Sequence, residues 1–173
     1  MSHPLALAVF PTATAAVDAA RALHDIGILR EHISVLARDH AEARDLADRM
    51  DATPGVELED SPVAARLGEL SGYVLAAIAM GLPGIGPIVA AGPLASELSD
   101  VAGHAAGSLA SVLKRAGLPG ERADALQRDV AAGGVLVGVH IMGADRRALT
   151  ERVRDCLAAA GATELEIVNW ASD

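Results

Sequence analysis

The sequence predicts an α+β fold, because patterns typical of a strand, a helix and a strand follow one another near both ends of the chain. Apolar residues alternate over 4–10 and again over 32–37, and each alternation is typical of a strand. Between them, apolar residues recur at helical spacing over 13–26, and Gly27 follows where a helix commonly ends in a left-handed glycine. The first strand-helix-strand half therefore spans 4–37.

The same order returns at the other end of the chain, over 134–170. An alternating apolar run begins this half, a helical stripe then ends at Gly161, and Leu165 and Ile167 alternate with glutamates. Two βαβ halves of this size predict a ferredoxin-like split βαβ sandwich, in which one antiparallel sheet carries both helices on one face. The length of 173 residues suffices for one compact core, so we expect a single domain over 1–173.

A long insertion separates the two halves where a hairpin would usually suffice. It covers 38–133, about 95 residues, which is well beyond an ordinary loop. Its patterns are mainly helical, and we predict a glycine- and alanine-rich helical hairpin over 63–116. The run 71–96 carries no charge, so we expect it to be buried against something. Glycines and prolines break the helical pattern at 81–87 and predict the bend of the hairpin there.

The predicted second helix of the hairpin, from about 94 to 116, has one face of very small side chains. Glycine or serine recurs there at four-residue intervals, which allows two backbones to approach closely. This contact could lie inside the protomer, between subunits or in a membrane. Replacing Gly103 and Gly107 with leucine should disrupt an assembly contact and leave the sheet foldable. The residues that we predict to form the bend and the assembly surface are Gly81, Pro83, Gly84, Gly86, Pro87, Gly92, Pro93, Ser99, Gly103, Gly107 and Ser111.

Composition and charge restrict the partners of this chain. Hydrophobic residues make up 51% of it, more than one small core needs, so we expect a homo-oligomer or a protein partner. The formal net charge of -9 repels phosphate backbones and anionic headgroups, and aromatic residues that could stack on bases are only 2%. We therefore expect no nucleic acid ligand. The single cysteine, Cys156, and the absence of an export signal predict a cytoplasmic protein.

Membrane contact is possible but disfavoured. The most apolar helical segment, 70–82, has about 13 residues, whereas a helix that spans a membrane needs about 20. The next predicted helix carries Glu97 and Asp100 near its start. A hairpin that enters one leaflet stays open as an alternative, although helices at a membrane surface usually carry Lys or Arg on the polar face.

No catalytic, metal or cofactor motif stands out, and we predict a protein that is not an enzyme. Glu97, Asp100 and His104 share one predicted helix face, but charge at the helix start and pairing four residues apart explain them without a metal. Cys156 lies on an apolar helical stripe and is predicted to be a core thiol rather than a nucleophile.

His140 is the histidine with the most interesting position in the predicted sheet. We place it on the sheet face away from the two helices of the βαβ halves, a face that we expect it to share with Ala6, Ala8, Leu36 and Gly138. Such a face could hold a ligand or a second subunit. A half-buried sheet histidine beneath the insertion is the simpler interpretation.

Several stretches together resemble a known family. They are Val9-Phe-Pro-Thr12 before an alanine-rich helix, Gly27-Ile28, Ile33-Ser-Val-Leu-Ala37, Leu82-Pro-Gly-Ile-Gly-Pro87, Ala91-Gly-Pro93, Gly117-Leu-Pro119 and Gly133-Gly-Val-Leu-Val137. They resemble the bacterial general stress protein-like (heat-induced stress protein) domain family, and its larger members with a glycine zipper. Two departures from that pattern are Leu126 in place of a tyrosine and, instead of a long Gly-Ala run, the residues Arg66, Glu69, Tyr73 and Leu75. The resemblance implies a cytoplasmic, stress-associated protein and supplies no catalytic residue.

These observations together predict a non-enzymatic, stress-associated structural protein that self-associates or docks to a larger assembly through its hydrophobic, glycine-rich hairpin. One alternative is a stress protein at a membrane surface, with the hairpin in one leaflet. Another is a ferredoxin-like dimer that binds a small ligand, or acts as an enzyme, through the sheet face near His140.

Overall fold

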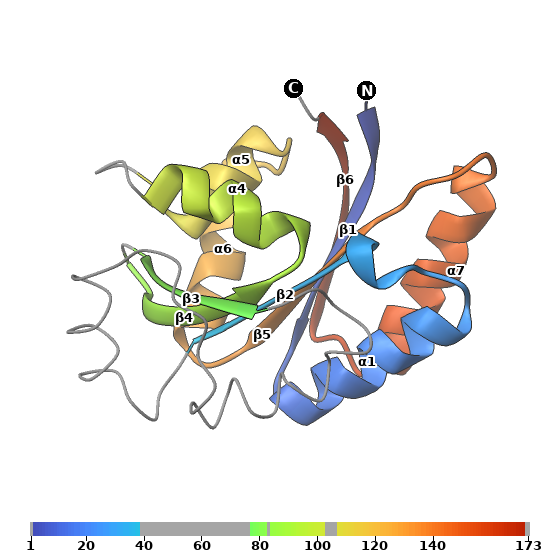
Figure 1. Ribbon diagram of the computed structural model, residues 1–173, viewed down its shortest axis with the longest axis horizontal. Helices are drawn as coiled ribbons and strands as arrows, with labels where there is room; N and C mark the ends of the chain where they lie inside the picture. The colour runs from blue at the N-terminus through green and yellow to red at the C-terminus, as the bar shows by residue number, and fades with distance from the viewer. Residues whose placement is uncertain (1, 39–76, 83, 103–106, 172–173) are drawn as a thin grey trace.

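An antiparallel sheet with helices on both faces organises the part of the chain that the structure describes (Figure 1). The structure is a computed structural model, and it describes residues 2–38, 77–82, 84–102 and 107–171. Its elements are β1 (Ser2–Phe10), α1 (Ala13–Asp25), the 3-10 helix η1 (Arg30–His32), β2 (Ile33–Arg38), β3 (Ala77–Leu82), β4 (Gly86–Ala91), α4 (Pro93–Ala102), α5 (Leu109–Arg115), α6 (Gly120–Ala131), β5 (Val135–His140), α7 (Arg146–Ala159) and β6 (Glu164–Ala171).

The six described strands form one sheet in the order β3-β4-β2-β5-β1-β6, and every neighbouring pair is antiparallel. The α+β class is confirmed, as are the strands and helices predicted for the two outer halves. The two chain ends lie together, because Ser2 pairs with Ala171. Figure 1 shows both ends side by side at the edge formed by β1 and β6.

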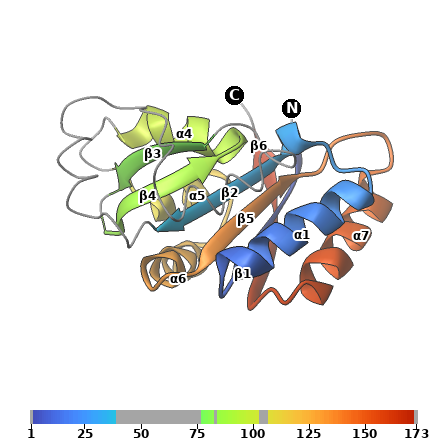
Figure 2. The ribbon, with the colours of Figure 1, turned by 60° about the horizontal axis from the view of Figure 1, so that its bottom comes forward.

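Two apolar cores lie on opposite faces of this sheet. The first core joins α1 and α7 to one face and includes Ala6, Ala8 and Phe10 of β1. The second core joins α4, α5 and α6 to the other face and includes Leu5 and Leu7 of the same strand. Figure 2 shows α1 and α7 together on their side of the sheet. Both faces are therefore covered, which explains why β1, β2 and β5 are nearly continuous apolar runs.

The face assigned to His140 needs one correction. Residues that pair directly across antiparallel strands point to the same face, and His140 pairs with Leu5. His140 therefore shares the α4–α6 face with Leu36, as expected, but Ala6 and Ala8 point to the α1–α7 side. The prediction was wrong for these alanines because it placed the larger leucines of β1 against the two helices of the βαβ halves. In the structure, Leu5 and Leu7 pack against α4, α5 and α6 instead.

The predicted helical hairpin is wrong over 77–82. Of the segment predicted to be its first helix, residues 63–76 lie outside the described residues, and Ala77–Leu82 is strand β3. This strand pairs with β4, and β4 in turn pairs with β2. A short apolar run has the same composition in a buried helix and in a strand, and here the pairing of backbone groups favours the strand.

The predicted second helix is divided into α4 and α5. Gly107 and Ser108 are not helical, and the Ser108 side chain caps α5 by accepting a hydrogen bond from the Ser111 backbone N–H at 3.2 Å. Ser99 therefore lies in a different helix from Ser111, and Gly103 lies outside the described residues. The four small residues do not form one continuous helix face, so the double leucine variant no longer tests an assembly contact.

A buried serine links β2 to the start of α4. The Ser34 hydroxyl oxygen accepts a hydrogen bond from the Leu94 backbone N–H at 3.0 Å, and Ser34 is buried. Ser34→Ala leaves this N–H without its partner, so we expect a loss of about 1–3 kcal/mol of folding free energy in urea unfolding. Ser96→Ala, at an exposed position of α4, is the matched control. Equal stability of the two variants would contradict this role of the hydroxyl.

Candidate functional site

The outer edge of β3 is an end of the sheet, and no described strand pairs with it. Its register shows which backbone groups point outward. Gly81 is opposite Pro87, and proline has no N–H, so these two residues cannot form a hydrogen-bonded pair. The alternating pairs, such as Met80 with Ile88, are the hydrogen-bonded ones. It follows that Ala77, Ala79 and Gly81 direct their backbone N–H and C=O groups away from the sheet.

The two edges of the sheet differ in charge. The segment 77–91, which contains β3 and β4, has no charged residue. The opposite edge strand, β6, carries Glu164 and Glu166, and both carboxylates bind the Arg122 guanidinium of α6, with 2.9 Å between Arg122 Nη2 and Glu164 Oε2. Charged side chains that point toward the fold protect an edge strand from pairing with another chain. The described part of β3 has no such protection.

Glycines of the predicted bend shape the turn between β3 and β4. Gly84 and Gly86 have positive φ angles of 83° and 94°, which side chains with a Cβ rarely adopt. The Ile85 N–H donates to the Leu82 carbonyl oxygen at 3.2 Å and closes the turn. These residues do form a bend as predicted, but the bend joins strands and not helices. Pro83 lies outside the described residues.

Gly92 and Pro93 join the hairpin to α4. Gly92 has a φ of 81° and lies against the backbone of Ile33 and Ser34. Pro93 is the first residue of α4, where a proline loses no helical hydrogen bond. The chain thus turns from β4 directly across β2, and this turn places α4 on the sheet.

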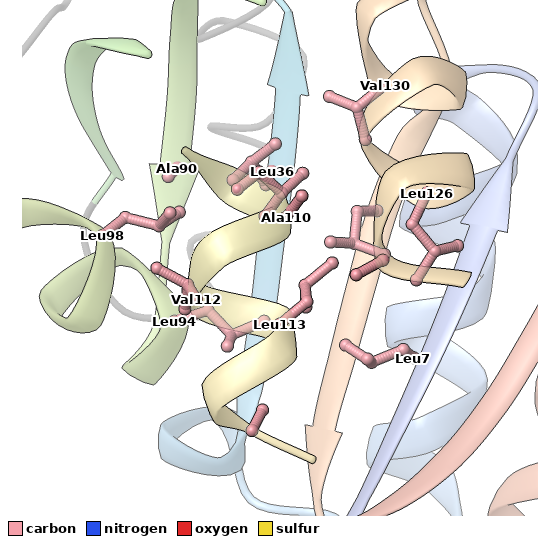
Figure 3. Close-up of a cluster of buried hydrophobic side chains, with 14 of the residues drawn as sticks. Leu7, Leu36, Ala90, Leu94, Leu98, Ala110, Val112, Leu113, Leu126 and Val130 are labelled. Carbon is pink, nitrogen blue, oxygen red and sulfur yellow. The ribbon is translucent and has the colours of Figure 1, made fainter. Parts of the chain in front are cut away.

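In the described part of the insertion, apolar side chains of α4 and α5 are buried inside the protomer. Leu94 and Leu98 of α4, and Leu113 of α5, are each at most 2% exposed and belong to the second core. In Figure 3, Leu113 lies between the side chains of α4 and those of α6. The surplus of apolar residues noted in the sequence is therefore used in part to cover the second face of the sheet. Gly107 is also buried, at the entrance to α5.

A second candidate site is a buried cluster of His3, His140 and Trp170. His3 Nε2 lies 2.8 Å from His140 Nδ1, and both side chains are 5% exposed. The His140 ring contacts Trp170 edge to face, with 5.4 Å between the ring centroids. His140 Nε2 is buried and has no hydrogen-bond partner within the part of the chain that the structure describes.

The pKa of His140 is lowered to about 4, first by burial and then by His3 and His32. Burial also lowers the pKa of His3, with further contributions from Arg146, His32 and the α-amino group. Both shifts favour the neutral form of the rings at pH 7. The sequence singled out His140 but missed His3 and Trp170, because no motif spacing connects residues of three different strands.

The other candidates of the sequence do not form a chemical site in the described residues. Glu97 is exposed, the Asp100 side chain is not described, and His104 lies outside the described residues. No group of three or more His, Cys, Asp or Glu side chains suited to a metal occurs in the described part of the chain. Cys156 is partly buried against the first core, and burial, followed by Asp25, raises the pKa of its thiol, which disfavours the thiolate.

A pocket of about 360 Å³ lies at the end of β1 far from His3. Thr163 uses its backbone N–H and its hydroxyl to bind the Val9 carbonyl oxygen, at 2.8 and 3.1 Å. The Glu164 carboxylate is already paired with Arg122. The pocket is lined by Val9, Phe10, Pro11, Asp129, Ala132, Gly133, Gly134, Thr163 and Glu164. This lining offers no His or Cys side chain for catalysis.

Comparison with known proteins finds no matching family, no matching curated protein and no matching solved structure. The resemblance to the stress protein family therefore stays a prediction. Within the described ranges, none of the helices has the length and apolar character needed to cross a membrane.

Proposed function

We propose that this protein is a non-enzymatic assembly protein that self-associates by pairing the outer edge of β3 with the same edge of a second copy. The observation that carries this proposal is the uncharged edge formed by Ala77, Ala79 and Gly81, with which none of the other described strands pairs. The insertion predicted to mediate assembly keeps that role, but through a β-hairpin.

The β3 edge is complementary to itself. In an antiparallel pair related by a two-fold axis through Ala79, Ala77 of each copy is opposite Gly81 of the other. All three residues direct their backbone groups outward, so each such pair can form both hydrogen bonds. A two-fold contact uses the same patch on both subunits.

Local charge permits this contact although the whole chain is acidic. The formal charge of -9 disfavours self-association over most of the surface. No charged residue lies in 71–96, so the hairpin itself brings no like charges together.

We also propose that β2, β5, β1 and β6 form a ferredoxin-like frame to which the β3–β4 hairpin is added beyond β2. Their antiparallel order and the two βαβ connections support this interpretation. In this frame the sheet face near His140 is covered by α4, α5 and α6, which gives less support to a ligand site there. The burial of the α4 and α5 leucines likewise gives little support to a hairpin in lipid.

Absolute mass in solution, by size-exclusion chromatography with light scattering, tests the proposal. We expect the untagged protein to have twice the 17.6 kDa of the chain, and Ala79→Pro to have the monomer mass. Proline at position 79 removes an outward N–H and leaves the hydrogen bonds between β3 and β4 in place. Ala79→Lys, which places like charges beside the two-fold axis, should have the same effect.

Leu29→Ser is the matched control, because Leu29 is 53% exposed and lies far from β3 in the chain. It should keep the dimer mass, and circular dichroism should show that all variants are folded. A wild-type monomer at every concentration, or a folded Ala79→Pro variant that stays dimeric, would overturn the proposal.

A further inference from the structure

The His3, His140 and Trp170 cluster connects three neighbouring strands where the chain begins and ends. His3 of β1 pairs with Trp170 of β6, and the next residues along β1 lead to Leu5, which pairs with His140 at the end of β5. The contact between the two histidine rings joins residues 137 positions apart in the chain. A change in this contact therefore acts on β1 and β5 together.

Protonation decides whether the two rings attract or repel each other. A neutral pair holds one proton between His3 Nε2 and His140 Nδ1 at 2.8 Å. When both rings are protonated, two N–H groups point at each other and the hydrogen bond is lost. His140 Nε2 has no partner among the described residues, so nothing there offsets a positive charge on the buried ring.

The groups whose charge lowers the pKa of His3 or His140 carry a positive charge or acquire one when protonated. The Arg146 guanidinium of α7 donates to the Ser2 carbonyl oxygen at 2.9 Å, beside His3. His32 of η1 acts on both rings, and the α-amino group acts on His3. The exposed Glu31 carboxylate lies beside His32, with 3.8 Å between Glu31 Oε1 and His32 Nε2.

We infer that the His3–His140 pair is a pH-sensitive clasp, which holds the ends of β1, β5 and β6 together when neutral and opens when both rings are protonated. The inference goes beyond the proposed assembly role, since the clasp and the β3 edge lie at different edges of the sheet. Opening the clasp loosens β6 and exposes Trp170, which is 6% exposed in the closed state.

The sign of the pH effect follows from the shifted pKa of His140. The pKa in the folded protein, about 4, is lower than the ordinary value of 6.5 for a solvated ring. The open form therefore binds protons more readily, and acid favours it. The clasp is fully closed above pH 6.5, and its contribution is lost as the pH falls from 6.5 toward 4.

Trp170 reports on the clasp directly, because it is the only tryptophan of the chain. We expect its emission to shift to longer wavelength as the pH of the full-length protein is lowered from 8 to 4 at constant ionic strength. In the double variant His3→Gln/His140→Asn, which keeps neutral polar groups but cannot be protonated, this shift should be absent down to pH 4.5. The control His24→Gln removes an exposed histidine of α1 and should behave as the wild type. The same acid shift in the double variant would overturn the inference.

A second measurement keeps the inference testable if the double variant does not fold. The imidazole proton resonances of wild-type His3 and His140 should move in coupled steps below pH 6.5, together with the emission shift. Two independent titrations near pH 6.5 would overturn the clasp.

Discussion

Gly92→Ala is expected to lower the free energy of unfolding by roughly 2–6 kcal/mol, which combines the cost of a strained backbone with that of overpacking. The glycine has a φ of 81°, and an added Cβ would overlap the Ile33 carbonyl oxygen and stand 2.8 Å from Ser34 Cα. These are backbone atoms of a central strand, so they cannot move aside without disturbing the pairing of β2. Urea unfolding of the purified variant measures the loss.

Gly27→Ala is the matched control for this prediction. Gly27 has a similar φ of 92°, but nothing lies within 4 Å of an added Cβ. We therefore expect Gly27→Ala to lower the free energy of unfolding only by the cost of the backbone conformation, about 1–2 kcal/mol. If the two variants lost the same stability, the close approach of Gly92 to β2 would not matter.

Leu113→Ala is expected to destabilise the whole protein by about 2–5 kcal/mol, the usual cost of a cavity left by a buried leucine. Leu113 is fully buried in the second core with Leu7 of β1 and Leu36 of β2 (Figure 3). Because these strands also contribute to the first core, α5 and the sheet should unfold together. Circular dichroism and Trp170 fluorescence should give coincident transitions in urea.

Arg115→Ala, at an exposed position of the same helix, should change stability by less than about 0.5 kcal/mol. Two separate transitions in Leu113→Ala, with the sheet unfolding at the wild-type urea concentration, would contradict a shared core. They would show instead that the insertion folds on its own.

The outer halves of the fold could be predicted because their signals are local. Apolar alternation in β1 and β5, and helical spacing in α1 and α7, depend on residues within one element. The pattern also singled out Gly84, Gly86 and Gly92, since positions with positive φ strongly favour glycine. Each of these features is a property of a short stretch of backbone.

The insertion was harder to predict because its apolar residues suit both a helix and a strand. Residues 77–82 became a strand because β4 offers them hydrogen-bond partners, and β4 exists because β2 does the same for it. Likewise, α4 and α5 are separate helices that each cover part of the sheet. A local sequence pattern does not show beside which strand a segment will lie in the folded sheet.

Local periodicity and glycine placement thus determine the two βαβ halves and the location of the bends. Both are features of the amino-acid sequence alone. The position of β3 at the end of the described sheet and the contact between His3 and His140 depend on the strand order and register. Those are decided only when distant segments bury their apolar faces and pair their backbone groups on one sheet.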